Sequence, residues 1–255
     1  MPSIVISYFL KDVRGNFFKN WYTFSMNIEK KKAYLHYLKN FVTKERQEKI
    51  KSVLALRTRH VTVALEDVCH SQNVAAIMRT CEAMGLQDMY AIEVDKTIDI
   101  KTNVARGSIQ WMNLYRYHKE KYEDPLLTCI QDLKQKGYTV VATSPHASKK
   151  LSDLPIDKKI AFVFGTENFG LSDQALQAAD EQIALPQYGF VESFNVAVAA
   201  ALCVYDVVTR LRASQISWHM SPEELFEAEI AWMEHSIERS HILKTVFLDQ
   251  YKAPL

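Results

Sequence analysis

KIAFVFGTENFGLSDQALQAADEQIALPQYGFVESFNVAVAAALCVYDVVTRLR, residues 159–212, is the stretch of this sequence that decides its fold. Residues 160–164 are apolar without polar alternation, which is typical of a strand buried on both faces of a parallel sheet. A turn bounded by glycines follows, and then a short helix that starts at Ser172 or Asp173. We predict a second strand over 182–186, a loop, and a helix whose apolar residues recur at helical spacing. The pattern therefore indicates an α/β fold.

Polar residues follow both of these predicted strands. Glu167 lies in the turn between Gly165 and Gly170, and Ser193 and Asn195 lie in the loop before the long helix. Ligands of open α/β sheets bind at the carboxyl ends of the strands. We therefore expect the functional site where these turns meet.

The composition is that of a cytoplasmic protein with one sizeable core. The chain has 255 residues, of which 48% are hydrophobic, and its net charge of +1 means that a nucleic-acid partner requires a local basic patch. No apolar run approaches the ~20 residues of a membrane span, and residues 1–25 lack the layout of a signal peptide. We expect no membrane partner. The four cysteines show no CxxC spacing, which favours reduced thiols: Cys69, Cys81, Cys129 and Cys203.

The rest of the chain divides around a central alternation of strand and helix patterns, which predicts a mostly parallel sheet flanked by helices. Ser221, Pro222 and Glu224 form a capping box that opens a long helix reaching about residue 250. We divide the chain into an undetermined N-terminal segment, a basic extension of two helices, the α/β domain and a C-terminal helical extension: residues 1–25, 26–60, 61–212 and 213–255.

Basic residues strongly outnumber acidic ones over residues 26–60. A solvated helix face is the ordinary interpretation of such charges, and an arm that contacts RNA phosphates is the functional one. Arg57 and Arg59 are the candidate phosphate contacts within this segment.

A dinucleotide site of the ordinary Rossmann type is excluded at the first strand. That site requires a glycine-rich turn after the strand, whereas VALEDVCHSQN, residues 63–73, contains no glycine. Three of the seven glycines lie between residues 165 and 189. A nucleoside cofactor is therefore expected at the C-terminal part of the sheet.

Three motifs in order resemble the signature motifs of the SpoU/TrmH family, the RNA ribose 2′-O-methyltransferases of the SPOUT superfamily. They are NVAAIMRTCEAMG at 73–85, FVFGTENFGLS at 162–172 and LPQYGFVESFNVAVAAALCVYD at 185–206. The resemblance covers roughly residues 43–212. Residues 43–68, which lead into the first motif, are most similar to the TrmH branch, whose members methylate the D-loop guanosine 18 of tRNA. The alternatives are the same chemistry on ribosomal RNA and a catalytically silent RNA-binding dimer.

The resemblance also implies features that the hydrophobic pattern does not give. It implies a deep trefoil knot in the C-terminal part of the sheet, although knots are exceptions among folds. It further implies a homodimer with an isologous interface and an active site that uses both subunits.

The cofactor implied by the resemblance is S-adenosylmethionine, held largely by backbone groups at strand ends. Thr143, Leu185 and Phe194 match positions where the family holds it, and Gly165 and Gln187 fall in the same loops. Ordinary strand-end packing is the alternative role for Thr143, Leu185 and Phe194.

The catalytic residues that the resemblance implies are Asn73, Arg79, Glu167, Ser193 and Asn195. Because Asn73 and Arg79 are six positions apart, about 240° around a helix, they do not share one face. We expect Asn73 in the turn or at the cap before the helix, with Arg79 on its second turn. Because guanidinium resists deprotonation, we interpret Arg79 as a clamp on the neighbouring phosphate instead of the general base that family accounts often describe.

Basic residues at the end of the long predicted helix complete the expected RNA contacts. Arg210 and Arg212 lie near positions where the family has basic residues, and a ribose in an RNA loop suits such an enzyme. The sequence departs from the family pattern at Thr166, where Asn or Gln is more frequent, at Phe194, and in the pre-motif segment CHSQN. These departures affect the expected substrate more than the expected activity.

Overall fold

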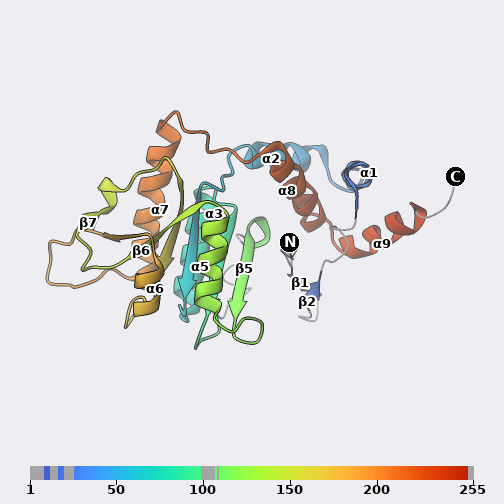
Figure 1. Cartoon of the computed structure of the whole chain (residues 1–255). Coiled ribbons are helices and arrows are strands. Elements are labelled where there is room, and N and C mark those ends of the chain that lie inside the picture. Colours follow the sequence, from blue (N-terminus) through green and yellow to red (C-terminus); the bar gives the residue numbers. More distant parts are fainter. Residues whose placement is uncertain (1–8, 12–16, 20–25, 99–106, 108, 252–255) are drawn as a thin grey trace. The chain divides into compact units, whose positions relative to one another are not determined.

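The computed structural model describes residues 9–11, 17–19, 26–98, 107 and 109–251. The chain forms two compact units, one from residues 1–57 and 220–255 and the other from residues 58–219 (Figure 1). The two helical extensions expected from the sequence thus belong to a single unit. Of the N-terminal segment predicted as undetermined, the structure describes an antiparallel pair of strands, β1 and β2: Phe9–Lys11 and Phe17–Lys19.

The unit of residues 58–219 is built on a seven-stranded sheet in the order β5-β4-β3-β8-β6-β9-β7, and all of its strand pairs are parallel. Both β3 and β4 are buried along their whole length, which explains their nearly continuous apolar sequences. The prediction of a mostly parallel α/β sheet is therefore confirmed. The strands β3 to β9 are Val61–Glu66, Asp88–Glu93, Asn113–His118, Tyr138–Thr143, Lys149–Lys150, Lys159–Phe164 and Glu181–Ala184.

Helices cover both faces of this sheet. Side chains of α3 and α7 share one apolar core with Val63, Leu65 and Phe162, while α5 and α6 share a second core with Ala64 and Val163 on the opposite face. The two cores separate because successive residues of a strand point to opposite faces. The helices α3, α5, α6 and α7 are Ser71–Ala83, Pro125–Gln135, Asp173–Ala178 and Val196–Ala213, and two 3₁₀ turns, η1 and η2, are Ile109–Trp111 and Leu151–Asp153.

Several helix starts are fixed by side-chain caps. Ser172 accepts a hydrogen bond from the backbone of α6, which places the start at one of the two predicted residues. Asn195 caps α7. By contrast, α3 already begins at Ser71, so that Asn73 lies within the first helical turn and not in the preceding turn or at the cap, where the sequence analysis placed it.

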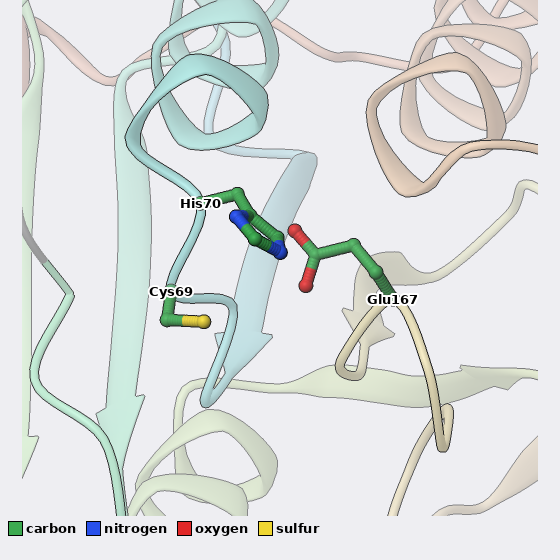
Figure 2. A group of neighbouring side chains, drawn as sticks. All are labelled: Cys69, His70 and Glu167. Carbon is green, nitrogen blue, oxygen red and sulfur yellow. The ribbon is translucent and has the colours of Figure 1, made fainter.

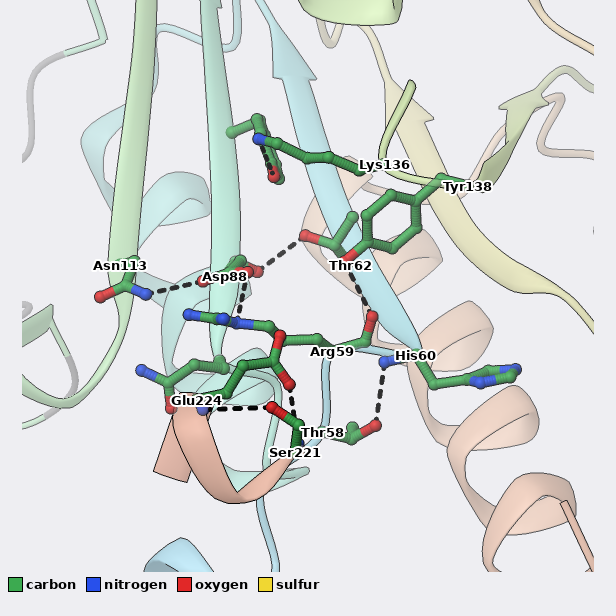
Figure 3. A network of polar contacts seen from close by, with 12 residues as sticks. Thr58, Arg59, His60, Thr62, Asp88, Asn113, Lys136, Tyr138, Ser221 and Glu224 are labelled. Atoms are coloured by element: carbon green, nitrogen blue, oxygen red, sulfur yellow. Dashed lines mark hydrogen bonds and ion pairs between the residues drawn. The ribbon is translucent and has the colours of Figure 1, made fainter. Parts of the chain in front are cut away.

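A network of hydrogen bonds and an ion pair lies at the edge of the sheet where β3, β4 and β5 begin (Figure 3). Asn113 donates to Asp88 at 2.8 Å, Thr62 Oγ1 donates to the Asp88 carbonyl at 2.8 Å, and Arg59 Nε lies 3.0 Å from Asp88 Oδ2. Tyr138 donates to the Arg59 carbonyl. Arg59, predicted as an RNA contact, therefore makes structural contacts at the amino-terminal edge of the sheet.

The unit formed by the two chain ends contains four helices among its described residues. The predicted capping box of Ser221 and Glu224 is confirmed, and Thr43 caps α2. The single long helix predicted from Pro222 is wrong, because α8 ends at His235 and Arg239 has a left-handed backbone with φ 59°. The helices α1, α2, α8 and α9 are Ile28–Lys39, Lys44–Leu54, Pro222–His235 and Ser240–Gln250. Among the described helices, none combines the length and apolarity that a membrane span requires.

A buried ion pair lies inside this unit. Lys244 Nζ lies 3.0 Å from Glu234 Oε1, and the Tyr34 hydroxyl donates to the same oxygen at 2.8 Å. Both charged side chains are less than a tenth exposed. Burial, together with the Glu234 carboxylate, raises the pKa of Tyr34 above its ordinary value, so the tyrosine stays a neutral donor.

Glu234→Leu should lower the free energy of unfolding by about 3–5 kcal/mol, because Lys244 is left as a buried charge without its carboxylate. Urea denaturation monitored by circular dichroism measures this loss. The double variant Glu234→Leu/Lys244→Met removes both charges and should be clearly more stable than the single variant. Equal stability of the two variants would contradict a role for the ion pair.

Candidate active site

The predicted cofactor positions gather at one edge of the sheet. Thr143 ends β6, Gly165 follows β8 and Leu185 follows β9. Because these strands are parallel neighbours in the order β8-β6-β9, their carboxyl ends meet at the same edge. The loops that follow them therefore enclose the place where the sequence predicts a ligand.

Three predicted catalytic residues form one chain of hydrogen bonds. Asn73 Nδ2 donates to Glu167 Oε1 at 2.7 Å, and Asn195 Nδ2 donates to Asn73 Oδ1 at 3.1 Å. The Oδ1 atom of Asn195 accepts from the backbone N–H groups of Ala197 and Val198 at the start of α7. Each amide thus has a fixed orientation, and the three motif segments are joined at the level of side chains.

The loop after β8 is tightly closed. Thr166 and Gly170 exchange two backbone hydrogen bonds of 2.9 Å, and Gly170 has φ +69°, which favours glycine. A Cβ atom on Gly165 would lie 2.0 Å from the Gly170 carbonyl oxygen. Glycine at position 165 is therefore required for the close approach of the two ends of the loop that presents Glu167.

Two acidic residues at the carboxyl end of β3, Glu66 and Asp67, bind the neighbouring segments. The carboxylate of Glu66 accepts from the backbone N–H of Ser172 at 3.0 Å and from its hydroxyl at 2.5 Å, which pins the far end of the Glu167 loop. Asp67, at φ 51°, accepts backbone N–H bonds from the turn after β4, among them Val94 at 2.8 Å. A carboxylate with several backbone donors is strongly ordered, so the turn that leads to α3 is fixed.

Arg79 and Ser193 are the two predicted catalytic residues that lie outside this chain of hydrogen bonds. Both are exposed, and within the described part of the chain neither side chain has a hydrogen bond or an ion pair. Arg79 lies on the third turn of α3, six residues beyond Asn73. Its guanidinium is therefore available to a group from outside this chain.

A cavity of about 400 Å³ lies beside the loops after β9. Leu185 and Phe194, two of the predicted cofactor residues, line it together with Pro186 and with Leu202 and Tyr205 of α7. Its volume lies in the range of small-molecule pockets, and its walls are mostly apolar. The residues present therefore fit a nucleoside-sized ligand with an apolar face.

The other predicted cofactor residues have more ordinary surroundings. Thr143 Oγ1 donates to the Val163 carbonyl at 3.1 Å, which is a strand-end contact, and Gln187 is half-buried in the loop after β9. Neither they nor Gly165 line the cavity of about 400 Å³.

The predicted RNA-binding arginines are engaged within the chain. Arg210 pairs with Asp206 at 2.7 Å and donates to the Leu154 carbonyl at 2.9 Å. The guanidinium of Arg212 lies 4.6 Å from the centre of the Trp218 ring. Arg57 is only 1% exposed, and this burial argues against a phosphate contact. These arginines therefore have structural contacts within the chain, while RNA binding by the exposed Arg212 and the half-buried Arg210 stays a prediction.

The sequence interpretation missed two side chains that lie beside Glu167. Cys69 and His70 come from the turn before α3, and with Glu167 they point toward a common centre (Figure 2). The adjacent Cys and His in CHSQN were the available signal, but nothing in the spacing connects them to a glutamate almost a hundred residues later.

One fast-reacting thiol per native chain is expected, because Cys69 is half-buried while the other three cysteines are buried. Burial raises the pKa of Cys81 and of Cys203 to about 12 and also raises that of Cys129, which keeps these thiols protonated. Titration with a disulfide reagent should release about one equivalent in native protein and four in denaturant. Cys69→Ala should abolish the native reaction, and a fast reaction that persists would contradict the assignment.

Comparisons with known proteins show the family of the chain. Residues 60–205 match the family model described as the SpoU rRNA Methylase family. The tRNA (guanosine(18)-2′-O)-methyltransferase of Borreliella burgdorferi is 37% identical over 210 residues, which cover 82% of this chain and 94% of that protein. The enzyme of the same name from Thermus thermophilus is 32% identical over 194 residues, or 75% of this chain and 97% of that protein.

A solved structure extends the match to the fold. The crystal structure of the A. aeolicus TrmH/SpoU tRNA modifying enzyme superposes with a TM-score of 0.66 at 25% identity, covering 77% of this chain and 98% of that one. The motif segments, the parallel sheet and these matches lead to one conclusion. The chain belongs to the SpoU rRNA methylase family.

Proposed function

We propose that this protein is an S-adenosylmethionine-dependent RNA ribose 2′-O-methyltransferase that acts on guanosine 18 of tRNA. The observation that carries the proposal is the hydrogen-bonded chain Glu167–Asn73–Asn195, which joins the three motif segments at the carboxyl edge of the sheet. The names of the two tRNA methyltransferases that match most of the chain support the choice of substrate.

The cofactor supplies an electrophilic sulfonium methyl group when it is bound. We assign Leu185 and Phe194 to its apolar face, since both line the cavity of about 400 Å³. Backbone groups at Thr143, Gly165 and Gln187 complete the proposed binding loops. Such groups recognise the edge of a base without a charged side chain.

The protein's own contribution is then mainly positioning. Methyl transfer requires the ribose 2′-oxygen in line with the methyl group, and a fixed near-attack geometry supplies a large part of the rate. Glu167 fixes the rotamer of Asn73, and Asn195 holds the other side of the same amide. Ser193, exposed in the loop before α7, offers a further hydroxyl to the RNA.

The proposal includes a homodimer and a knotted C-terminal segment. Val198, Leu202 and Tyr205 form an exposed apolar stripe on α7, 42–63% exposed, which suits an isologous interface. In such a dimer Arg79, which has no partner within the described part of its own chain, would serve the partner's site. We retain the trefoil knot and a cytoplasmic location as expectations from the family.

Arg79→Lys should lower kcat/KM by about tenfold or more, because an ammonium replaces the bidentate fork that clamps a phosphate. KM for tRNA should rise while the affinity for S-adenosylmethionine, measured by calorimetry, stays unchanged. Exposed Lys158 offers a matched control, since Lys158→Arg also exchanges one cation for the other and lies before β8, at the opposite end of this strand from the proposed site. Near-normal turnover of Arg79→Lys would rule out the clamp.

The function itself is tested with S-adenosylmethionine that carries a labelled methyl group and with matched RNA transcripts. A tRNA with guanosine 18 should accept about one methyl group, and the same tRNA with 2′-deoxyguanosine at that position should accept none, because the acceptor oxygen is missing. Methylation of ribosomal RNA fragments in place of tRNA would favour the second candidate substrate. Lack of both methylation and cofactor binding would contradict the enzyme and leave a silent RNA-binding dimer.

A further inference from the structure

The segment before α3 and the loop after β8 bring together three side chains of different chemistry. The ligand atoms of Cys69, His70 and Glu167 all lie within 4.8 Å of one another. Figure 2 shows the three side chains converging from two backbone segments. Cys69 and Glu167 are half-buried, and His70 is exposed, so the cluster is reachable from solvent.

Other structural contacts leave ligand atoms of His70 and Glu167 available to bind a metal ion. His70 occupies the N-cap position of α3 yet makes no side-chain capping bond. Glu167 Oε1 accepts a hydrogen bond from Asn73 Nδ2 at 2.7 Å, and within the described part of the chain the second carboxylate oxygen accepts none. A carboxylate that binds a metal with one oxygen and accepts a hydrogen bond with the other is a common arrangement, because outer contacts orient the ligand.

We propose that Cys69, His70 and Glu167 form a site for one thiophilic divalent cation of the zinc class. A thiolate and an imidazole select Zn²⁺ or Co²⁺ over Mg²⁺, which prefers oxygen ligands. Thiolate and carboxylate together carry two negative charges, which match the ion. Three protein ligands leave the fourth tetrahedral position to water, as in open zinc sites.

The geometry requires only small adjustments. With metal–ligand distances of about 2.0–2.3 Å, ligand atoms around a tetrahedral zinc ion lie roughly 3.3–3.8 Å apart. Side-chain rotation closes the difference from the present separations, while the backbone of both segments is held by the contacts of Asp67 and Glu66. A bound ion would cross-link the turn before α3 to the loop that carries Glu167, so that it stabilises the folded state.

Cobalt(II) titration of the tag-free, fully reduced protein tests the site. One equivalent should produce a thiolate-to-cobalt charge-transfer band together with the visible bands of a tetrahedral ion, and Zn²⁺ should displace it. Cys69→Ala and Cys69→Ser should lose the charge-transfer band, and His70→Ala and Glu167→Gln should each weaken Co²⁺ binding at least tenfold. Cys129→Ala and His146→Ala are the matched controls, one a buried thiol and one an exposed histidine that is not part of the cluster, and both should keep the band.

This titration tests the metal site independently of whether the protein methylates tRNA, since it needs neither RNA nor S-adenosylmethionine. Absence of the band in the wild type, or its persistence in both Cys69 variants, would overturn the proposal. Unchanged affinity in both His70→Ala and Glu167→Gln would also overturn it, because the thiol would then act alone. Circular dichroism confirms that each variant is folded, and thermal unfolding with Zn²⁺ should show a rise in Tm that Cys69→Ala lacks.

Discussion

Asn73→Asp should lower kcat/KM for tRNA methylation on the order of 10²- to 10³-fold. The substitution changes one NH₂ group to oxygen, so that the hydrogen bond of 2.7 Å to Glu167 becomes a contact between two carboxylates. Like charges at that distance do not both ionise without moving apart. The side chain that joins Glu167 to Asn195 would therefore lose its position, while its volume stays the same.

The double variant Asn73→Asp/Glu167→Gln distinguishes positioning from charge. The amide introduced at position 167 then donates to the new carboxylate, which still accepts from Asn195, so the chain of hydrogen bonds is restored with its first bond reversed. We expect the double variant to be at least about tenfold more active than Asn73→Asp, because one charge-assisted hydrogen bond is regained. Single-turnover rates measure the effect, and Glu167→Gln alone, which keeps an acceptor oxygen, should lose less than Asn73→Asp. No recovery in the double variant would show that Glu167 is needed for its charge.

Gly165→Ala should destabilise the protein by about 3 kcal/mol and abolish detectable binding of S-adenosylmethionine. The added Cβ would lie 2.0 Å from the Gly170 carbonyl oxygen and 2.3 Å from the Leu171 nitrogen. Both are backbone atoms, which cannot turn aside as a flexible side chain can. The loop must therefore open, and the paired hydrogen bonds between Thr166 and Gly170 are lost.

Gly189→Ala provides the matched control, because a Cβ there meets nothing within 4 Å. Its Tm should stay close to that of the wild type, whereas Gly165→Ala should unfold at a clearly lower temperature. Isothermal titration calorimetry gives the cofactor affinity in the same preparations. Normal affinity in Gly165→Ala would mean that the closed loop has no part in holding the cofactor.

Much of the α/β fold was predictable because buried parallel strands have a distinctive sequence. The predicted strand over residues 160–164 lies within β8, and the alternation of strand and helix patterns gave the class of sheet. Helix interruptions were harder to predict. Nothing in the residues before Arg239 marks the left-handed backbone that separates α8 from α9, since no glycine stands at this position.

The candidate site was predictable where residues carry a family motif and less so where long-range contacts decide. Asn73, Glu167 and Asn195 were identified and lie together. Arg210 was expected to face RNA, yet it binds carbonyl oxygens of the segment around η2 that local sequence cannot reveal. The proximity of Cys69 to Glu167 likewise depends on the order of strands in the sheet.

The distances along the chain between the hydrogen-bonded residues have a consequence for biosynthesis. Asn73 and Asn195 are 122 positions apart, and the Asn195 side chain is oriented only when α7 has formed behind it. The start of α7 must therefore leave the ribosome before the hydrogen bond between Asn195 and Asn73 can form. Domains fold as units during translation. A nascent chain in which Asn73 and Glu167 have already been synthesised is therefore expected to stay inactive until late in its synthesis.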